Sequence, residues 1–245
     1  MKFIVLEEVD STNSYVSAHA GELDDLTMVM ATSQTAGRGQ RGNAWESEPG
    51  SNLTFTLLWK PSGLHPRDQF AVSEATALAM SDFLESEGID ARVKWPNDIY
   101  VADGKIAGIL IEHSITPDHI EHSRIGVGLN VNQTRFVSDA PNPVSMAMVD
   151  SIRREISHVA ARVGAMLENR LQQALTPEGR NRLHGDFQKK MWRFDGRPYP
   201  FRVHETGAEF RGVIRGVDPK GPILIADCES GREDSYYFKQ VEFIL

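Results

Sequence analysis

The chain of 245 residues has one cysteine, no long hydrophobic run and no excess of basic residues. The single cysteine, Cys228, cannot form an internal disulfide, which favours a reducing compartment. The apolar start at Met1 runs into Glu7 and Glu8 and is too short for a signal peptide, and no other run reaches membrane-spanning length. A formal net charge of −8 argues against general nucleic-acid binding. These absences predict a cytoplasmic protein without a membrane partner.

The composition that remains is typical of a globular protein, with 40% hydrophobic and 24% charged residues. Alternating and apolar segments predict strands at residues 2–9, 27–32, 52–59, 106–112 and 119–131, and two further strands joined by a tight turn within residues 91–101. Apolar residues at helical spacing predict helices at residues 10–20, 66–87, 156–174 and 177–192. Since long strands are interleaved with few helices, the pattern favours an α+β fold with a mixed β-sheet and flanking helices over regular βαβ winding.

The periodicity changes near Asp195. Short predicted strands separated by Gly, Pro and Asp turns follow at residues 199–204, 209–217, 223–226, 234–238 and 241–245. They predict a small barrel or sandwich, which gives two domains, 1–194 and 195–245. An RNA-binding role for the second domain is disfavoured because its basic residues are mixed with acids, and because Tyr236, Tyr237 and Phe238 are predicted to lie on a core strand.

A glycine- and arginine-rich loop follows the second predicted strand. Residues 37–42 match the dinucleotide-binding spacing G-x-G-x-x-G. That motif requires a helix directly afterwards and an acid about twenty residues on. Residues 43–50 are a poor helix start, and residues 60–63 contain no acid. A flexible cationic loop remains, in which glycine permits close backbone approach and arginine suits a carboxylate or phosphate. The alternative is a solvated surface turn.

Two further stretches are polar and unusual. Residues Ser11, Thr12 and Asn13 favour a helix start, where they serve either as simple caps or as a small recognition site. Lys94 to Asp98 places a Trp-Pro pair and an Asn-Asp pair at a tight turn between two strands. This turn is either structural or a cluster of functional groups at a strand end.

Taken together, four motifs resemble the biotin protein ligases. They are Ser11–Asn13, Gly37–Gly42 with Trp45, Lys94–Asp98 and Gly104–Glu112, in this order, and the tail 236–242 resembles the end of that family's SH3-like domain. The resemblance extends over nearly the whole chain. It implies a class II synthetase-like catalytic domain followed by a small SH3-like β-barrel.

The resemblance also implies an activity. Such enzymes join biotin to ATP, giving biotinyl-5′-AMP and diphosphate, and then transfer biotin to a lysine of a biotin carboxyl carrier domain. The biotin carboxylate and the α-phosphate of ATP are both anions and must be neutralised and aligned. Positioning and electrostatic stabilisation should therefore dominate catalysis, with Mg²⁺ carrying part of the charge. Arg38, Lys105 and Asp98 are the catalytic candidates by this resemblance, and Asp98 is also the candidate metal ligand.

The same resemblance assigns the binding residues. Biotin would contact Ser11, Thr12, Asn13, Gln34, Gly37, Arg38, Gly39, Gln40, Lys105 and Gly108. ATP or the adenylate would contact Arg38, Arg41, Trp45, Lys94, Asn97, Lys105 and Asn130, with Trp45 stacked on adenine. Many family members have arginine where this chain has Gln40, which predicts looser retention of the adenylate.

Several alternatives stay open at this stage. A lipoate or octanoate ligase or transferase shares the architecture, but an aliphatic chain needs fewer polar partners than a ureido ring, so residues 11–13 favour biotin. A non-enzymatic biotin or nucleotide sensor could dispense with part of the charge-neutralising set. Because the Ser-Thr-Asn motif begins at residue 11, we expect no DNA-binding domain and no DNA partner. A homodimer is left open.

Two weaker signals are interpreted as structural. His113, His119 and His122 lack a recognised zinc spacing, so we expect surface histidines. Cys228 is expected to be a small packing residue.

Overall fold

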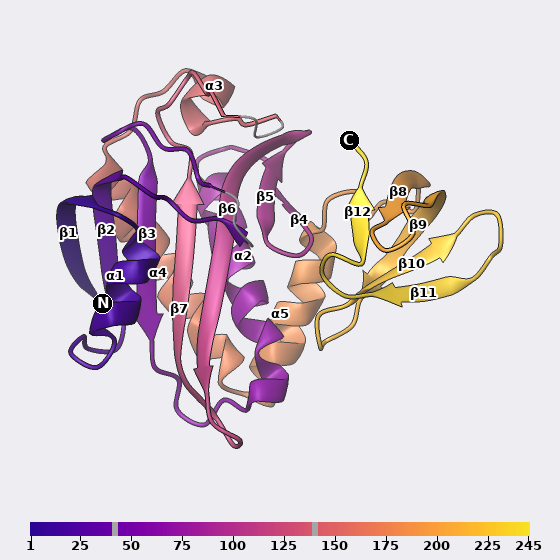
Figure 1. The fold of residues 1–245 in the computed structure, drawn as a ribbon, viewed down its shortest axis with the longest axis horizontal. Helices are drawn as coiled ribbons and strands as arrows, with labels where there is room; N and C mark the ends of the chain where they lie inside the picture. Colours follow the sequence, from indigo (N-terminus) through magenta and orange to yellow (C-terminus); the bar gives the residue numbers. More distant parts are fainter. Residues whose placement is uncertain (41–43, 139–141) are drawn as a thin grey trace.

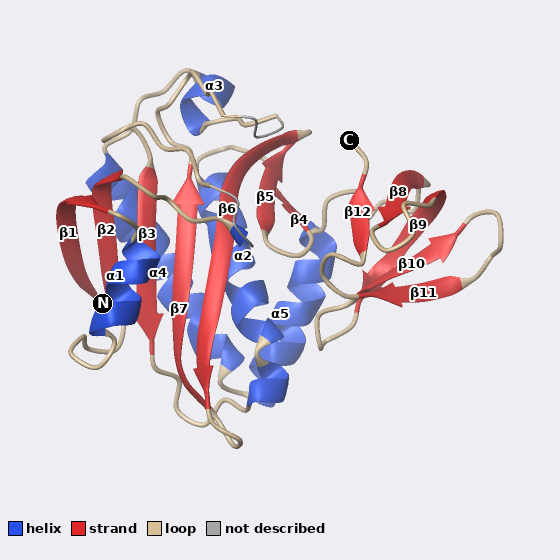
Figure 2. Ribbon diagram, in the orientation of Figure 1, coloured by secondary structure: helices blue, strands red, loops and turns tan. Residues whose placement is uncertain are grey.

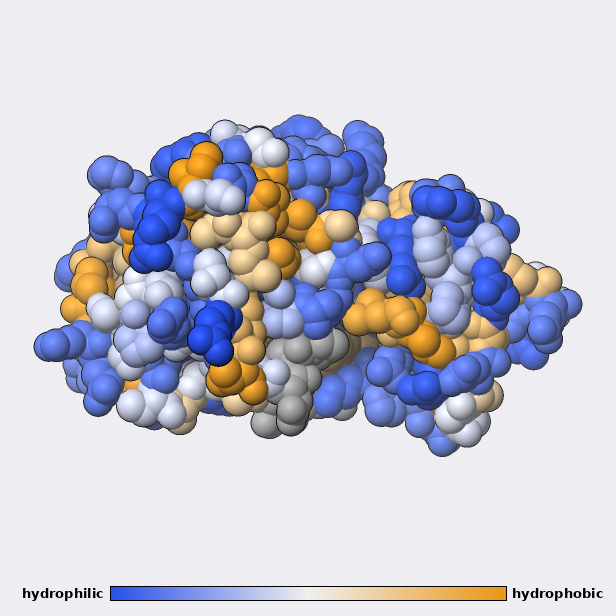
Figure 3. All heavy atoms as spheres, turned by 90° about the horizontal axis from the view of Figure 1, so that it is seen from above, coloured by the Kyte–Doolittle hydropathy of each residue, from blue (hydrophilic) through white to orange (hydrophobic). Residues whose placement is uncertain are grey.

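A computed structural model describes residues 1–40, 44–138 and 142–245. These residues form a seven-stranded sheet with helices and a separate five-stranded sheet (Figure 1). Seen from above, the second sheet makes a smaller lobe beside the first (Figure 3). Arg41 lies outside the described residues, so its predicted ATP contact stays a prediction.

The larger sheet is mixed. Its strand order is β1-β2-β3-β7-β6-β5-β4, in which β1 and β2 are parallel and the other pairs antiparallel. The strands are β1 (Lys2–Val9), β2 (Thr27–Gln34), β3 (Leu53–Trp59), β4 (Arg92–Lys94), β5 (Asp98–Val101), β6 (Gly104–Ile115) and β7 (Ile120–Leu129). The predicted α+β class with a mixed sheet is confirmed.

The helices cover the two faces of this sheet unequally. The short α1 (Thr12–His19) lies on one face, and α2 (Phe70–Ser86), α4 (Ile156–Ala174) and α5 (Pro177–Lys190) cover the other (Figure 2). The predicted helix from residue 66 begins instead with a 3₁₀ turn, Pro66–Asp68. A five-residue helix that the pattern did not predict, α3 (Met146–Asp150), is capped by the Ser145 hydroxyl, which accepts a hydrogen bond from the Met148 N–H.

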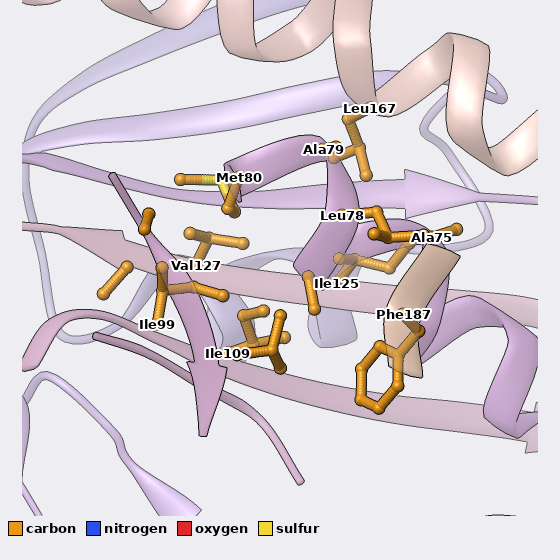
Figure 4. Close-up of a cluster of buried hydrophobic side chains, with 14 of the residues drawn as sticks. Ala75, Leu78, Ala79, Met80, Ile99, Ile109, Ile125, Val127, Leu167 and Phe187 are labelled. Atoms are coloured by element: carbon orange, nitrogen blue, oxygen red, sulfur yellow. The ribbon is translucent and has the colours of Figure 1, made fainter. Parts of the chain in front are cut away.

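The core lies between the helices and the sheet. Sheet residues such as Ile109, Ile125 and Val127 face Leu78 of α2 and Phe187 of α5 (Figure 4). The apolar stripe predicted for residues 156–174 packs α4 against α2. With one face of the sheet sealed in this way, the opposite face is left for a binding site.

The smaller sheet is wholly antiparallel, in the order β11-β10-β9-β8-β12. Its strands are β8 (Tyr199–Val203), β9 (Glu209–Val217), β10 (Ile223–Asp227), β11 (Glu233–Tyr236) and β12 (Val241–Phe243). This agrees with the expected small SH3-like domain. We propose that the domain boundary lies near Asp195, between α5 and β8.

Aromatic side chains join the two sheets. The Trp95 Nε1–H donates to the Gly221 carbonyl over 2.8 Å, and the Trp95 ring meets Phe238 edge-on at 6.4 Å between centroids. Trp192 similarly contacts Phe243, 6.0 Å away. The smaller sheet is therefore held against the Lys94–Asp98 turn.

Two expectations about the smaller sheet are wrong. Strand β11 ends at Tyr236, and Tyr237 and Phe238 are 59% and 37% exposed, so these two rings do not belong to a core strand. Cys228 is exposed rather than a packing residue. It follows β10 directly, in a turn.

Among the helices of the described ranges, none is long and apolar enough to cross a membrane.

Candidate active site

A cleft of about 370 Å³ opens on the face of the larger sheet that carries α1, and its rim includes residues of the smaller sheet. It brings together most of the predicted site residues: Ser11, Thr12, Asn13, Gln34, Arg38, Gly39, Gln40, Trp45, Lys94, Asn97, Asp98, Lys105 and Gly108. In the part of the chain that the structure describes, Gly37 and Asn130 do not line the cleft. The motifs, which are far apart in the sequence, thus meet in one place.

The floor of the cleft is formed by paired residues of β6 and β7. Gly108 is opposite Gly128, Leu110 is opposite Gly126, and Glu112 follows as the next residue on this face. Glycine inside a strand marks a place where another group approaches the backbone closely. The alternating glycines at 126 and 128 carry this signal in the sequence, although no site role was predicted for them.

A polar pocket lies where α1 begins above this floor. The Thr12 N–H donates to Gln34 Oε1 over 2.8 Å, and the Thr12 and Thr56 hydroxyls are 2.9 Å apart. Asn13 is 3% exposed, yet neither its Nδ2 nor its Oδ1 has a partner among the described residues. Because a buried amide without partners is costly, Asn13 is suited to a ligand that both donates and accepts hydrogen bonds.

Trp45 enters the cleft from the glycine-rich loop. Its ring lies so close to Gly128 that a Cβ there would overlap the indole, and a Cβ at Gly108 would be 3.0 Å from the indole Cζ3. The buried indole Nε1 has no partner among the described residues. Gly37 supports this loop through backbone contacts with Trp45. Its carbonyl accepts the Trp45 N–H over 3.0 Å, and a Cβ at residue 37 would lie 2.6 Å from the Trp45 carbonyl oxygen.

Next to Trp45 lies an ion pair. Lys105 Nζ is 2.7 Å from Asp98 Oδ1 and 5.8 Å from the centroid of the Trp45 ring. The turn that carries Asp98 is braced by Asn97, whose Nδ2 donates to the Ile109 carbonyl over 2.6 Å. Asn97 therefore positions the turn, and the Lys105–Asp98 pair lines the cleft.

Lys94 lies deeper, towards the smaller sheet. Its Nζ donates to the Tyr100 hydroxyl over 3.1 Å and is 5.7 Å from the centroid of the Phe243 ring. Burial lowers the pKa of Lys94, although the nearby Asp98 carboxylate opposes this shift. Burial also raises the pKa of Tyr100. Lys94 thus adds positive charge behind the Lys105–Asp98 pair.

Arg38 lies away from Lys105. Its Nη2 is 3.5 Å from Glu112 Oε1, and its side chain is 48% exposed. Lys105 Nζ reaches Gly108, and Glu112 is four residues further along β6, about 13 Å of extended strand. In the structure Arg38 therefore contacts Glu112 and Lys105 contacts Asp98, and the catalytic roles of Arg38 and Lys105 stay predictions.

Glu46, for which no role was predicted, ties the loop after Trp45 to residues 133–138. Its carboxylate accepts the N–H groups of Val137 and Ser138 and the Nε2–H of Gln133. Burial acts to raise the pKa of Glu46, but these hydrogen bonds outweigh it and lower the pKa. Glu46, the residue next to Trp45, is therefore held firmly by hydrogen bonds.

Asn130 is 2% exposed. Its Nδ2 donates to the Val144 carbonyl over 3.0 Å, while its Oδ1 has no partner among the described residues.

Among the described residues, metal-binding side chains do not cluster. Within residues 1–40, 44–138 and 142–245 no group of three or more His, Cys, Asp or Glu side chains could hold an ion. The expectation of surface histidines is wrong for His113, which is partly buried and lies 2.8 Å from the Ser123 hydroxyl. Burial, with Arg124 nearby, lowers the pKa of His113 to about 4.

The site can be compared with known proteins. Residues 5–130 match the model of the biotin/lipoate A/B protein ligase family. The bifunctional ligase/repressor BirA of Salmonella typhimurium is 32% identical over 227 residues, which cover 90% of this chain and 68% of that protein. The biotin–[acetyl-CoA-carboxylase] ligase of Paracoccus denitrificans is 37% identical over 130 residues, 52% of this chain and 53% of that protein.

A solved structure agrees over nearly the full length. The biotin protein ligase of Aquifex aeolicus in complex with biotin and ATP superposes with a TM-score of 0.80 at 24% identity, covering 98% of this chain and 97% of that one. At this identity the likeness shows the fold, including the two-sheet arrangement.

Proposed function

The chain belongs to the biotin/lipoate A/B protein ligase family, and on this premise we propose that it is an ATP-dependent biotin protein ligase. In the first step a carboxylate oxygen of biotin attacks the α-phosphorus of ATP, and diphosphate leaves. In the second step a lysine amine of a biotin carboxyl carrier domain attacks the acyl carbon of biotinyl-5′-AMP. AMP leaves, and the lysine nitrogen loses its proton.

The observation that carries this proposal is the unpartnered amide of Asn13. It is buried in the polar pocket where α1 begins, with a donor and an acceptor both free, so far as the described residues show. A ureido ring presents a carbonyl and two N–H groups and matches this amide, whereas the alkyl chain of lipoate or octanoate offers no such groups. Asn13 therefore favours biotin over the other acids that the family handles.

Lys105 is the group best placed to neutralise the reacting anions. It lies in the cleft beside Trp45 and is held by Asp98, which keeps its ammonium oriented. A fixed cation at developing negative charge lowers the barrier without reorganisation during the reaction. A non-enzymatic sensor has no need of this charge, so the pair favours an enzyme.

Mg²⁺ is expected to accompany ATP. Such ions are commonly held by one or two carboxylates together with substrate phosphates, and Asp98 presents a carboxylate in the cleft. When bound, the ion would neutralise phosphate charge next to Lys105.

The remaining predicted contacts are kept as proposals. Ser11, Thr12 and Gln34 shape the ureido pocket, Trp45 stacks on adenine, and Lys94 and Asn97 support the phosphate side. Asn130 contacts adenine through its free Oδ1, which requires some opening of the cleft towards residue 130.

The decisive test offers the protein ATP, Mg²⁺ and either biotin or lipoate, with an apo biotin carboxyl carrier domain, and measures the intact mass of the acceptor. Addition of one biotin is expected, and none is expected on an acceptor whose target lysine is changed to arginine. A lipoyl addition, or no addition with biotin, would contradict the proposal.

A further inference from the structure

Glu112 lies at the end of the cleft floor and contacts two arginines. Its Oε1 is 3.5 Å from Arg38 Nη2, and its Oε2 is 3.5 Å from Arg124 Nη2. Among the described residues Arg38 lines both the cleft and a shallow hollow behind the glycine-rich loop, whereas Glu112 lines only the hollow. The contact with Glu112 therefore draws the Arg38 guanidinium to the outer side of the loop.

The two arginines differ in how firmly they are held. Arg124 is directly opposite Glu112 on the paired strands β7 and β6, and its side chain is only 18% exposed. Arg38 comes from the loop, and its side chain is 48% exposed. Arg124 thus belongs to the sheet, whereas Arg38 can leave Glu112 at little cost.

We propose that Glu112 is a positioning residue that holds the Arg38 guanidinium at the hollow behind the loop and competes for it with the anionic groups of the adenylate. The inference rests on the proposed function, because it takes the ligand to carry a carboxylate and phosphates. Arg38 cannot be drawn to Glu112 and engage the ligand with the same nitrogen atoms. When Arg38 turns to the ligand, Arg124 still neutralises Glu112, so no carboxylate is left unpaired.

The exposure of the Arg38–Glu112 ion pair limits how strongly Glu112 competes with the ligand for Arg38. Ion pairs as exposed as Arg38–Glu112 contribute about 0–1 kcal/mol, so the pairing should weaken ligand retention by at most about fivefold. A restraint of this size weakens the engagement of Arg38 without preventing it.

The first test is a double-mutant cycle on biotinyl-5′-AMP release. Glu112→Gln keeps an acceptor for Arg124 and should slow release about two- to fivefold. In an Arg38→Ala background the same change should have no effect, since the competition has been removed. Glu121→Gln, an exposed acid on β7 with the same change in charge, is the matched control and should match the wild type. An equal effect of Glu112→Gln in both backgrounds would overturn the proposal.

A second readout needs no ligand. Trypsin must take the Arg38 side chain into its own pocket, so cleavage after Arg38, identified by fragment mass, should be faster in Glu112→Gln than in the wild type or in Glu121→Gln. Wild-type cleavage in Glu112→Gln would overturn the proposal whatever the ligand. If no variant retains biotinyl-5′-AMP, the proposed function fails, while the cleavage rates still decide whether Glu112 holds Arg38.

Discussion

The indole ring of Trp45 occupies the space that a side chain at position 128 would need. A Cβ at position 128 would overlap Cε2 and Nε1 of the ring, and a Cβ at Gly108 on the neighbouring strand would lie 3.0 Å from Cζ3. The two glycines therefore form a seat for the loop residue that we propose stacks on adenine. Neither glycine has a positive φ, so it is space and not backbone conformation that requires glycine here.

Replacing Gly128 with alanine should displace Trp45 and raise the KM for ATP about 5- to 150-fold, the range that the loss of one base–aromatic stack would produce. The variant is checked by ATP titration of biotin-dependent ATP–diphosphate exchange. Gly21→Ala is the matched control, because a Cβ at residue 21 meets nothing within 4 Å. An unchanged KM in Gly128→Ala would mean that Trp45 does not bind the nucleotide.

Lys105→Ala should reduce biotin-dependent ATP–diphosphate exchange about 10²- to 10³-fold, as expected for loss of a fixed group that stabilises transition-state charge. The fold should persist, since Lys105 and Asp98 form a partly exposed pair that contributes little to stability. Exchange and the thermal midpoint are measured together. Lys2→Ala removes the exposed Lys2–Asp24 pair and serves as the control. Wild-type exchange in Lys105→Ala would refute the assigned role.

Gln40→Arg should slow the escape of biotinyl-5′-AMP about fivefold, the equivalent of one additional hydrogen bond worth ~1 kcal/mol. Gln40 lines the cleft, and its Oε1 is buried without a partner among the described residues. Arginine would bring a charge and a planar set of donors to the same place. Release of labelled adenylate is followed by filtration, with the exposed Gln172→Arg on α4 as the control. Equal release rates in Gln40→Arg and the wild type would show that the other cations of the site already suffice to retain the adenylate.

The Glu74–His184 pair should make stability depend on pH. Glu74 is 3% exposed, and His184 Nδ1 is 2.7 Å from its Oε1. This hydrogen bond raises the pKa of His184 above 6.5, against an opposing effect of burial. Burial raises the pKa of Glu74, against the opposing effect of His184. Gln188, on the same helix as His184, lies 3.1 Å from His184 Nε2, and Asp218 adds negative charge nearby.

A group whose pKa is raised by folding stabilises the fold below its ordinary pKa and loses that contribution as the pH rises through the raised value. The free energy of unfolding should therefore fall between about pH 6 and pH 9, and His184→Gln should flatten this slope. At the lower pH the variant should be about 2 kcal/mol less stable, because a buried carboxyl loses its partner. Urea unfolding at both pH values measures this, and parallel slopes would contradict it.

The sequence predicted the elements whose signals are local. The alternation at residues 52–59 and the stripe at residues 156–174 appear in β3 and α4, and the motifs at residues 11–13 and 94–98 line one cleft. The 3₁₀ start at Pro66 and the short α3 were missed, because each spans less than two helical turns and leaves no clear periodicity. The strand assigned to Tyr237 and Phe238 failed because an apolar run alone does not say whether a neighbour covers it.

What the sequence determined by itself was the supply of chemical groups: a cationic glycine-rich loop, a polar helix start, and a Lys–Asp pair near one turn. Tertiary structure alone decided which groups meet. It placed Arg38 beside Glu112, and it brought Trp95 to Gly221. These partners are far apart in the chain, so their contacts depend on strand register and on how the two sheets dock, which no local pattern encodes.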